Sequence, residues 1–301
     1  MKIVLLQKDG LGNQLFQYAA GLFFAKKYEA DLEVVRQPVE RAVAFGHPRP
    51  FALSNFCISA LVRERNNWDR LICSVSQKKK PLVIAARLIS GAVVWRQPVA
   101  EVWTYRPSLP IPRSARTVYV DGFFQTYQIA QDMEERLRSE FQFRYPASGK
   151  NIELLLKIRA AENSVSLHIR HGDYQVAHDG KLILSIQYQA QAMHLLRKKV
   201  GNPVFFVFSD DIALAREILP KGYNTVFVDH NDESMGHEDL RLMSACRHHV
   251  VANSTFSWWG AWLDPNPAKL VCAPGSWQNR ADDLPDPDIV PKDWLRIPTE
   301  I

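Results

Sequence analysis

The sequence predicts an α/β protein of two doubly wound domains, each built on a parallel sheet, that face one another across a cleft. A length of 301 residues favours two domains. Short β-rich runs alternate with helical patterns along most of the chain, as they do in proteins with parallel sheets. Turn-forming residues gather at 145–150 and predict a linker there. We therefore expect domains at residues 1–147 and 148–301, with ligands bound in the cleft between them.

The first 36 residues predict a strand, a turn, a helix and a second strand. Residues 3–6 form an apolar strand, and Gly10 and Gly12 allow a tight turn after it. Apolar side chains then recur at helical spacing through residues 13–28, with Asn13 as the N-cap. Eight prolines between residues 37 and 117 predict a loop-rich stretch. The other elements expected in this half are helices at 61–74, 81–90 and 126–143 and strands at 32–35 and 118–120.

The second half alternates more cleanly between strand and helix patterns. Its expected strands are residues 164–169, 204–208, 225–228, 250–252 and 270–273. Its expected helices are residues 185–200, 212–219, 238–246 and 256–263. Because parallel strands end at the same edge of a sheet, polar motifs that follow these strands should gather at that edge.

The composition is that of an ordinary globular protein and excludes collagen, coiled coil and disorder, with 47% hydrophobic and 23% charged residues. A net charge of +5 suits anionic small molecules or an acidic membrane surface but is too low for a dedicated nucleic-acid binder. The four cysteines form no CxxC pair, which argues against a disulfide framework or a zinc site. No apolar run is long enough to span a bilayer, so we expect a cytoplasmic protein. The basic run Lys78–Lys80 favours a solvated loop over a membrane-contact patch.

The turn after the first strand is the first candidate site. Gly10, Gly12, Asn13 and Gln14 stand where a backbone could approach a ligand closely. The pattern lacks the third glycine of a dinucleotide-binding loop, because Leu15 occupies that position. A purely structural turn explains these residues equally well.

The second candidate site is the charged stretch that follows the strand at 164–169. His168 and Arg170 share one face of that strand, and His171 and Asp173 follow. An arginine here could bind two phosphate oxygens at once. Such a cluster at a strand end favours function over a structural ion pair. No third group completes a metal shell, so we expect no metal.

Two more motifs follow strands and open helices. Asp210 and Asp211 could accept hydrogen bonds from a guanine edge or a ribose, and they could equally cap the helix. Ser254, Thr255 and Ser257 precede or begin a helix, where hydroxyls and backbone N–H groups favour phosphate. The three tryptophans that follow are explained most simply by packing between domains.

All three motifs of the second half lie at carboxyl ends of strands and can converge on one ligand with a diphosphate and hydroxyls. The sequence has no Walker-type lysine loop, which argues against kinase or NTPase chemistry. It also lacks the paired acids that hold a metal-bound nucleotide. Arg170 and a helix N-terminus would supply the positive charge instead. The pattern therefore indicates a metal-free nucleotide-sugar transferase.

Together these residues resemble the bacterial α-1,2-fucosyltransferases, glycosyltransferase family 11, over nearly the whole chain. The motifs that carry the resemblance are residues 10–19, 51–53, 122–125, 168–174, 208–211 and 253–263. The family often has arginine at the position of His171 and lysine at that of Gly275. At the first position a fixed charge is replaced by one that titrates near neutrality, which predicts pH-dependent phosphate binding.

The resemblance implies a GT-B fold of two Rossmann-like domains, in which residues 1–147 contact the acceptor and residues 148–301 bind the donor. It implies inverting transfer of L-fucose from GDP-L-fucose to the 2-hydroxyl of a galactose-terminated glycan, as in O-antigen synthesis, without a cofactor. On the donor side, the resemblance implies that His168 and either Asp210 or Asp211 contact guanine and that Arg170 contacts the diphosphate. It implies that phosphate oxygens are bound by Ser254, Thr255 and Ser257. On the acceptor side it implies Gly12, Asn13 and Gln14, with Asn13 near the reacting centre.

The general base stays open between Asp173 and His168. Two other functions also stay open, namely a transferase that uses another GDP-sugar and a non-catalytic carbohydrate-binding protein. A lipid-linked acceptor would bring the enzyme into peripheral contact with the inner face of the membrane.

Overall fold

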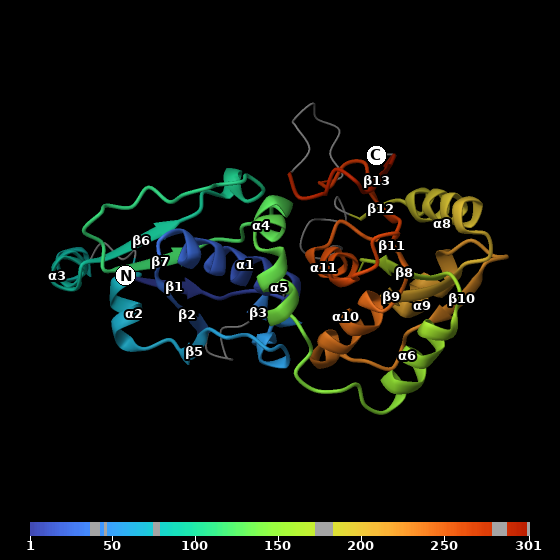
Figure 1. Cartoon of the computed structure of the whole chain (residues 1–301), viewed down its shortest axis with the longest axis horizontal. Coiled ribbons are helices and arrows are strands. Elements are labelled where there is room, and N and C mark those ends of the chain that lie inside the picture. The colour runs from blue at the N-terminus through green and yellow to red at the C-terminus, as the bar shows by residue number, and fades with distance from the viewer. Residues whose placement is uncertain (37–42, 45–46, 75–78, 172–182, 279–287, 300–301) are drawn as a thin grey trace. The chain divides into compact units, whose positions relative to one another are not determined.

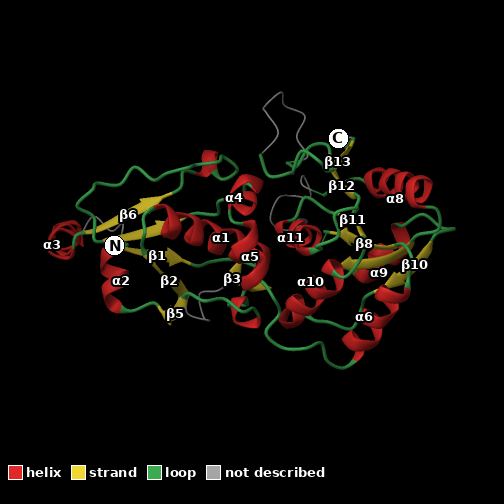
Figure 2. Cartoon of the chain, viewed as in Figure 1, coloured by secondary structure: helices red, strands yellow, loops and turns green. Residues whose placement is uncertain are grey.

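The computed structural model describes residues 1–36, 43–44, 47–74, 79–171, 183–278 and 288–299 of the 301-residue chain (Figure 1). These residues form two compact units, Met1–Gln142 and Phe143–Ile301. Each unit is an α/β domain with helices beside a parallel sheet (Figure 2). The predicted α/β class with two Rossmann-like domains is confirmed.

The first unit holds a five-stranded parallel sheet with the order β5-β2-β1-β7-β6. Its strands are β1 (Lys2–Leu6), β2 (Asp31–Arg36), β5 (Leu61–Glu64), β6 (Ala92–Arg96) and β7 (Thr117–Asp121), and β3 (Val43–Ala44) and β4 (His47–Pro48) form a separate two-stranded ribbon. The central strand β1 is buried because apolar residues fill both of its faces. The direction of strand order reverses between β1 and β7, which makes their carboxyl ends a topological switch point.

The helices of this unit are α1 (Leu11–Lys27), α2 (Asn67–Ile72), α3 (Lys80–Ser90), α4 (Tyr127–Asp132) and α5 (Glu134–Glu140). Three sequence predictions are wrong here. Residues 61–64 form a strand, not a helix, because they pair with β2. The helix expected at 126–143 is two helices that meet at Met133. Helix α1 begins at Leu11 with Gly10 as its N-cap, so Asn13 lies inside the first turn.

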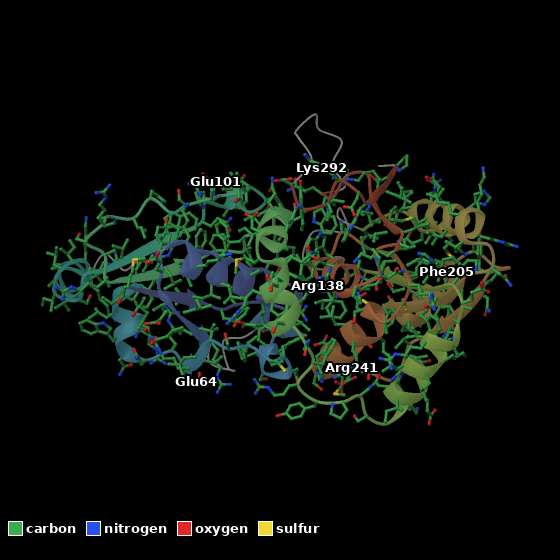
Figure 3. The ribbon with its side chains drawn as sticks, viewed as in Figure 1. Glu64, Glu101, Arg138, Phe205, Arg241 and Lys292 are labelled. Carbon is green, nitrogen blue, oxygen red and sulfur yellow. The ribbon has the colours of Figure 1, made fainter. Side chains whose placement is uncertain are left out.

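The second unit holds a six-stranded parallel sheet with the order β10-β9-β8-β11-β12-β13. Its strands are β8 (Ser164–Ile169), β9 (Val204–Ser209), β10 (Asn224–Phe227), β11 (His248–Val250), β12 (Val271–Pro274) and β13 (Leu295–Ile297). The order of the strands is that of a doubly wound nucleotide-binding sheet, with its switch point between β8 and β11. Apolar residues such as Phe205 on β9 fill its core (Figure 3).

Helices flank this second sheet (Figure 2). They are α6 (Lys150–Ala160), α8 (Ile186–Val200), α9 (Ile212–Ile218), α10 (Gly236–Ser244) and α11 (Thr255–Leu263). Helices α10 and α11 pack closely, since a Cβ at Gly260 would lie 2.9 Å from the Cβ of Met243. This glycine therefore sets how near α11 approaches its neighbour.

Contacts with α10 hold the start of the second unit. The guanidinium of Arg241, labelled in Figure 3, donates to the backbone oxygen of Tyr145 at 2.7 Å and lies 4.2 Å from the ring centroid of Phe143. These two contacts explain why the chain joins the second unit from Phe143 onward. Across the described residues, no helix combines the length and apolarity that crossing a bilayer requires.

Candidate functional site

The switch point of the second sheet brings together the segments after β8, β9 and β11. The register pairs His168 with Phe208 and Ile169 with Ser209, so Arg170 and Asp210 leave the sheet side by side. Strand β11 flanks β8 on the other side and leads directly into Ser254 and α11. Ligands of doubly wound sheets bind at this position, outside the carboxyl ends of the strands.

Arg170 and Asp210 form an ion pair at this edge. An Nη1–Oδ2 distance of 3.3 Å joins them, and each side chain is 22% exposed. The other carboxylate oxygen of Asp210 accepts a hydrogen bond of 2.9 Å from the backbone N–H of His171. Asp210 therefore holds both the guanidinium of Arg170 and the backbone at His171. The partly exposed guanidinium can bind an anion in a fixed orientation.

His168 lies beneath this pair and is almost completely buried. Burial and, less strongly, the positive charge of Arg170 lower the pKa of its imidazole to about 3, while Asp210 opposes the shift. The ring meets the ring of Phe256 edge-on, with centroids 5.9 Å apart. Among the described residues, its Nδ1 has no hydrogen-bond partner. The imidazole is therefore neutral near pH 7 and offers a hydrogen-bonding atom rather than a charge.

The N-terminus of α11 completes the charged edge. Ser254 caps the helix by accepting from the N–H of Phe256 at 3.3 Å. The hydroxyl of Ser257 accepts from the N–H of Ala252 and so fixes the chain between β11 and the helix. No acidic residue stands in the first turn, which begins at Thr255. The positive end of the helix dipole is therefore not neutralised by its own side chains, which favours an anion.

Asp211 has a structural contact that distinguishes it from Asp210. Its carboxylate caps α9 by accepting from the N–H of Leu214 at 2.9 Å. Of the two acids that the sequence left as alternatives for guanine, Asp210 is the one paired with Arg170.

The tryptophans of α11 pack inside the second unit. Trp258 and Trp259 are fully buried, and their ring centroids are 4.8 Å apart. Trp294 joins them from the C-terminal segment at 5.6 Å from Trp258, whose indole N–H donates to Ile289. Packing within the unit, rather than between domains, explains these contacts and holds α11 rigidly behind its N-terminus.

A second polar cluster lies at the switch point of the first sheet. The amide of Asn13 donates to Asp9 Oδ2 at 3.0 Å and accepts from Gln125 Nε2 at 2.7 Å. Lys8 pairs with Asp121 at 2.7 Å beside them. The cluster therefore joins the segments after β1 and β7 and leaves Asp9, Asn13 and Gln125 half-buried.

The backbone is strained at two positions of this cluster. Asp9 and Phe124 are non-glycine residues with positive φ, 68° and 53°. The side-chain oxygen of Gln97 accepts from the N–H groups of Phe123 and Phe124 at 2.8 and 3.0 Å and holds the second turn. Strain of this kind persists only where the surroundings enforce it, and it is frequent at functional sites.

The remaining residues predicted on the acceptor side support this cluster from behind. Gln14 is buried, donates to the backbone oxygens of Asp9 and Pro50, and accepts from the N–H of Ala52. Gly12 is buried within α1. Gln14 therefore braces the turn, and Asn13 is the predicted residue of this motif with a half-exposed amide.

Asp173 lies outside the described residues. Sequence reasoning missed Asp9, although it stands directly before Gly10 at the end of the first strand. Its position at a strand end was the available signal. Among the described residues, no group of three or more His, Cys, Asp or Glu is arranged to hold a metal ion.

The fold and site define a class of protein, a glycosyltransferase of the GT-B type with two Rossmann-like domains. Residues 105–297 match the sequence profile of Glycosyl transferase family 11. The chain belongs to this family, as its motifs predicted.

Curated relatives match much or nearly all of the chain. An alpha-1,2-colitosyltransferase of Escherichia coli is 29% identical over 99% of this chain and 99% of its own length. The O-antigen biosynthesis glycosyltransferase WbnK of Escherichia coli is 27% identical over 89% of this chain and 92% of its own. Galactoside alpha-(1,2)-fucosyltransferase 1 of Leontocebus fuscicollis is 25% identical over 48% of this chain and 42% of its own.

Among solved structures, the fold is similar to that of fucosyltransferase NodZ from Bradyrhizobium. The TM-score is 0.54 with 14% sequence identity, over 87% of this chain and 92% of that one. A structure of NodZ, an alpha-1,6-fucosyltransferase, was obtained from crystals soaked with GDP-fucose.

Proposed function

We propose that this enzyme transfers L-fucose from GDP-L-fucose to the 2-hydroxyl of a terminal galactoside, with inversion and without a metal ion. The observation that carries the proposal is the ion-paired Arg170 beside the N-terminus of α11 at a nucleotide-binding switch point. The α-1,2 linkage and the galactoside are supported by the names of the relatives. WbnK supports an O-antigen or similar glycan as the acceptor.

In this proposal the second unit binds the donor. Arg170 contacts the diphosphate, and the N-terminus of α11 at Ser254 and Thr255 binds the phosphate oxygens. The hydroxyl of Ser257 acts mainly by holding this turn in place. His168 presents a neutral imidazole to the guanine, and Asp210 orients Arg170 while its carboxylate faces the same edge.

The charge that develops in the reaction explains why an arginine is needed there. Inverting transfer breaks the bond between fucose C1 and the β-phosphate oxygen, so negative charge grows on the departing GDP. A guanidinium already held by Asp210 stabilises that charge without reorganising. Mutagenesis of comparable preorganised donors costs about 3–4 kcal/mol of transition-state stabilisation.

The acceptor must lose the proton of its 2-hydroxyl as the new bond to C1 forms. The low pKa of His168, about 3, makes its imidazole a poor base near neutrality. Asp173 stays a candidate. We add Asp9, whose carboxylate is held by the N–H of Gly10 at 2.6 Å and by Asn13 at the switch point of the first sheet. The first unit would then bind the acceptor through Asn13 and Asp9.

A second donor deserves a test because the colitosyltransferase matches 99% of this chain. Colitose is fucose without its 3-hydroxyl, so both GDP-sugars present the same nucleotide and a similar ring. A site whose buried polar groups bind the 3-hydroxyl rejects the deoxy sugar strongly, whereas a purely apolar pocket discriminates by only about 10- to 200-fold.

A comparison of donors tests the proposal. GDP-L-fucose, GDP-L-colitose and GDP-D-mannose are each supplied with a galactoside, and kcat/KM is measured for each. We expect the highest value with GDP-L-fucose. A higher value with GDP-L-colitose would assign the enzyme to that donor, and transfer from GDP-D-mannose alone would overturn the proposal. Binding of galactosides with no affinity for GDP would instead indicate a carbohydrate-binding protein.

We propose that the enzyme lies in the cytoplasm, where a lipid-linked glycan acceptor would bring it to the inner face of the membrane. No nucleic acid is expected as a partner, since the net charge of +5 is modest.

A further inference from the structure

Helix α3 of the first unit turns an apolar face to solvent. Four large aliphatic side chains on it are exposed, namely Leu82 (64%), Ile84 (49%), Leu88 (78%) and Ile89 (79%). Pro81 and Ala85 are exposed between them. On a helical projection these six residues occupy one continuous arc. A water-facing helix surface normally carries charged and polar residues, and this one carries none.

The opposite face of α3 is firmly packed, so the exposed face is not a consequence of loose docking. Val83 and Ala86 are buried. The guanidinium of Arg87 donates twice to the backbone oxygen of Ile72, at 3.0 and 2.7 Å. The helix ends at Gly91, whose left-handed conformation suits a C-cap. α3 therefore holds its apolar arc outward in a fixed orientation.

The surroundings of the arc are basic. Lys79 and Lys80 are exposed at the start of α3, and no acidic residue occurs within the helix. Exposed Arg70 and half-exposed Trp68 lie on α2, which packs against α3. Arg116 lies against the C-terminal end of α3, at Gly91. Lys78, also basic, lies outside the described residues.

We propose that the outer face of α3 docks on the surface of an anionic bilayer, with its aliphatic side chains among the acyl chains and Lys79 and Lys80 on the headgroups. An apolar helix face with lysines at its start, and with arginine and tryptophan exposed on the adjoining helix, has the composition of a segment that lies in a membrane interface. Eleven residues span about 16 Å along the axis, which suits a helix lying on the membrane rather than crossing it.

Charge complementarity selects a lipid surface over a second copy of the chain. The arc is flanked by positive charge, and two such faces brought together would place Lys79 and Lys80 near like charges. An anionic lipid surface attracts each of these residues. α3 lies at the end of the first unit near the start of β1, next to β6 (Figure 1).

Co-sedimentation with vesicles tests this proposal. The full chain is mixed with vesicles of phosphatidylcholine alone or of phosphatidylcholine with phosphatidylglycerol. We expect binding only to the anionic vesicles, reduced at least about tenfold in Leu88→Glu/Ile89→Glu and weakened by salt or by Lys79→Gln/Lys80→Gln. The matched control is Ile152→Glu/Leu156→Glu on α6, which also replaces two exposed aliphatic residues and should bind like the wild type.

Urea midpoints of the variants show whether the fold is intact. A folded Leu88→Glu/Ile89→Glu variant that binds anionic vesicles like the wild type overturns the proposal. So does a wild type that fails to bind them, or a concentration-dependent dimer that dissociates in this variant, because the face would then join two copies. None of these measurements uses the donor or the acceptor, so they test the membrane contact independently of the proposed function.

Discussion

Arg170 is held by a carboxylate that is itself fixed to the backbone. Asp210 pairs with the guanidinium at 3.3 Å and accepts from His171 at 2.9 Å. In the proposed reaction, such a pair keeps the arginine in place for the phosphate on which negative charge develops. Asp9 is held in a comparable way in the first unit, by Gly10 and Asn13.

The two residues should therefore fail differently when they are removed. Arg170→Ala should lower kcat/KM by about 10²–10³-fold and weaken GDP binding, because we propose that the lost group contacts the diphosphate. Asp9→Asn should lower kcat while the affinity for GDP stays unchanged, because we propose that its carboxylate contacts the acceptor. Steady-state rates and calorimetry with GDP measure both. Arg216→Ala, an exposed arginine of α9, is the control.

Near-normal turnover in a folded Arg170→Ala variant would exclude its role at the diphosphate. Loss of GDP affinity in Asp9→Asn would show that this carboxylate is not confined to the acceptor.

For individual residues, the sequence predicted the positions of the side chains more accurately than the contacts that they make. His168, Arg170, Asp210 and Ser254 were expected at one sheet edge, because polar residues that follow parallel strands must meet there. Asp211 was expected either to bind the ligand or to cap a helix, and Gln14 was expected on the acceptor side; in the structure Asp211 caps α9 and Gln14 braces a turn. The left-handed conformation of Asp9 was not predicted, and hydrogen bonds from Gly10, Asn13 and Gln14 accompany it.

At the scale of elements, a buried hydrogen-bonded chain joins β8, β11 and the end of α11. The Oγ atom of Ser166 lies 2.8 Å from His249 Nδ1, and the Oδ2 atom of Asp264 lies 3.1 Å from His249 Nε2. Burial lowers the pKa of His249, so the neutral ring accepts from the serine and donates to the carboxylate. All three side chains are buried, and they hydrogen-bond to one another. The chain therefore fixes α11 to the two central strands.

Replacing this histidine should therefore destabilise the fold. His249→Leu leaves a hydroxyl and a carboxylate buried without their partner and should cost about 3 kcal/mol of unfolding free energy. His194→Leu, an exposed histidine on α8, should change it by less than about 0.5 kcal/mol. Urea denaturation measures both variants. A cost below about 1 kcal/mol for His249→Leu would show that the chain does not hold α11.

Helices and strands were predictable where the hydrophobic pattern of the sequence is long and local. The helices α8 and α11 and the strands β8 and β9 appear close to their expected positions. β5 was mistaken for a helix, because its strand conformation comes from pairing with β2. The sequence analysis did not predict helix α6, because its exposed Leu156 and Ile152 obscure the apolar stripe by which a packed helix is identified.

At the scale of the whole molecule, buried neutral histidines make stability depend on pH. The pKa of His168 is about 3, and burial also lowers the pKa of His249 and His248. An unfolded histidine titrates near 6.5, so below that pH the unfolded chain binds more protons and the folded state loses stability. The carboxyl of Asp239, whose pKa burial raises to about 6, acts in the opposite direction.

Acidification from pH 7 to pH 5 should therefore lower the unfolding free energy. His168 alone contributes a loss of about 2 kcal/mol over this interval. Among the described residues with a shifted pKa, the histidines outnumber the opposing carboxyl of Asp239, so the net change should be negative. Urea midpoints at the two pH values measure it. An equal or higher midpoint at pH 5 would contradict the lowered pKa values of these imidazoles in the folded protein.

The central claim concerns the bond that the enzyme makes. The most direct measurement is incubation with GDP-L-fucose and lactose in the presence of EDTA, followed by linkage analysis of the product by NMR. We predict release of GDP together with a galactoside that carries α-fucose on its 2-hydroxyl. A fucosylated product with another linkage, or transfer that stops when EDTA is added, would contradict the account.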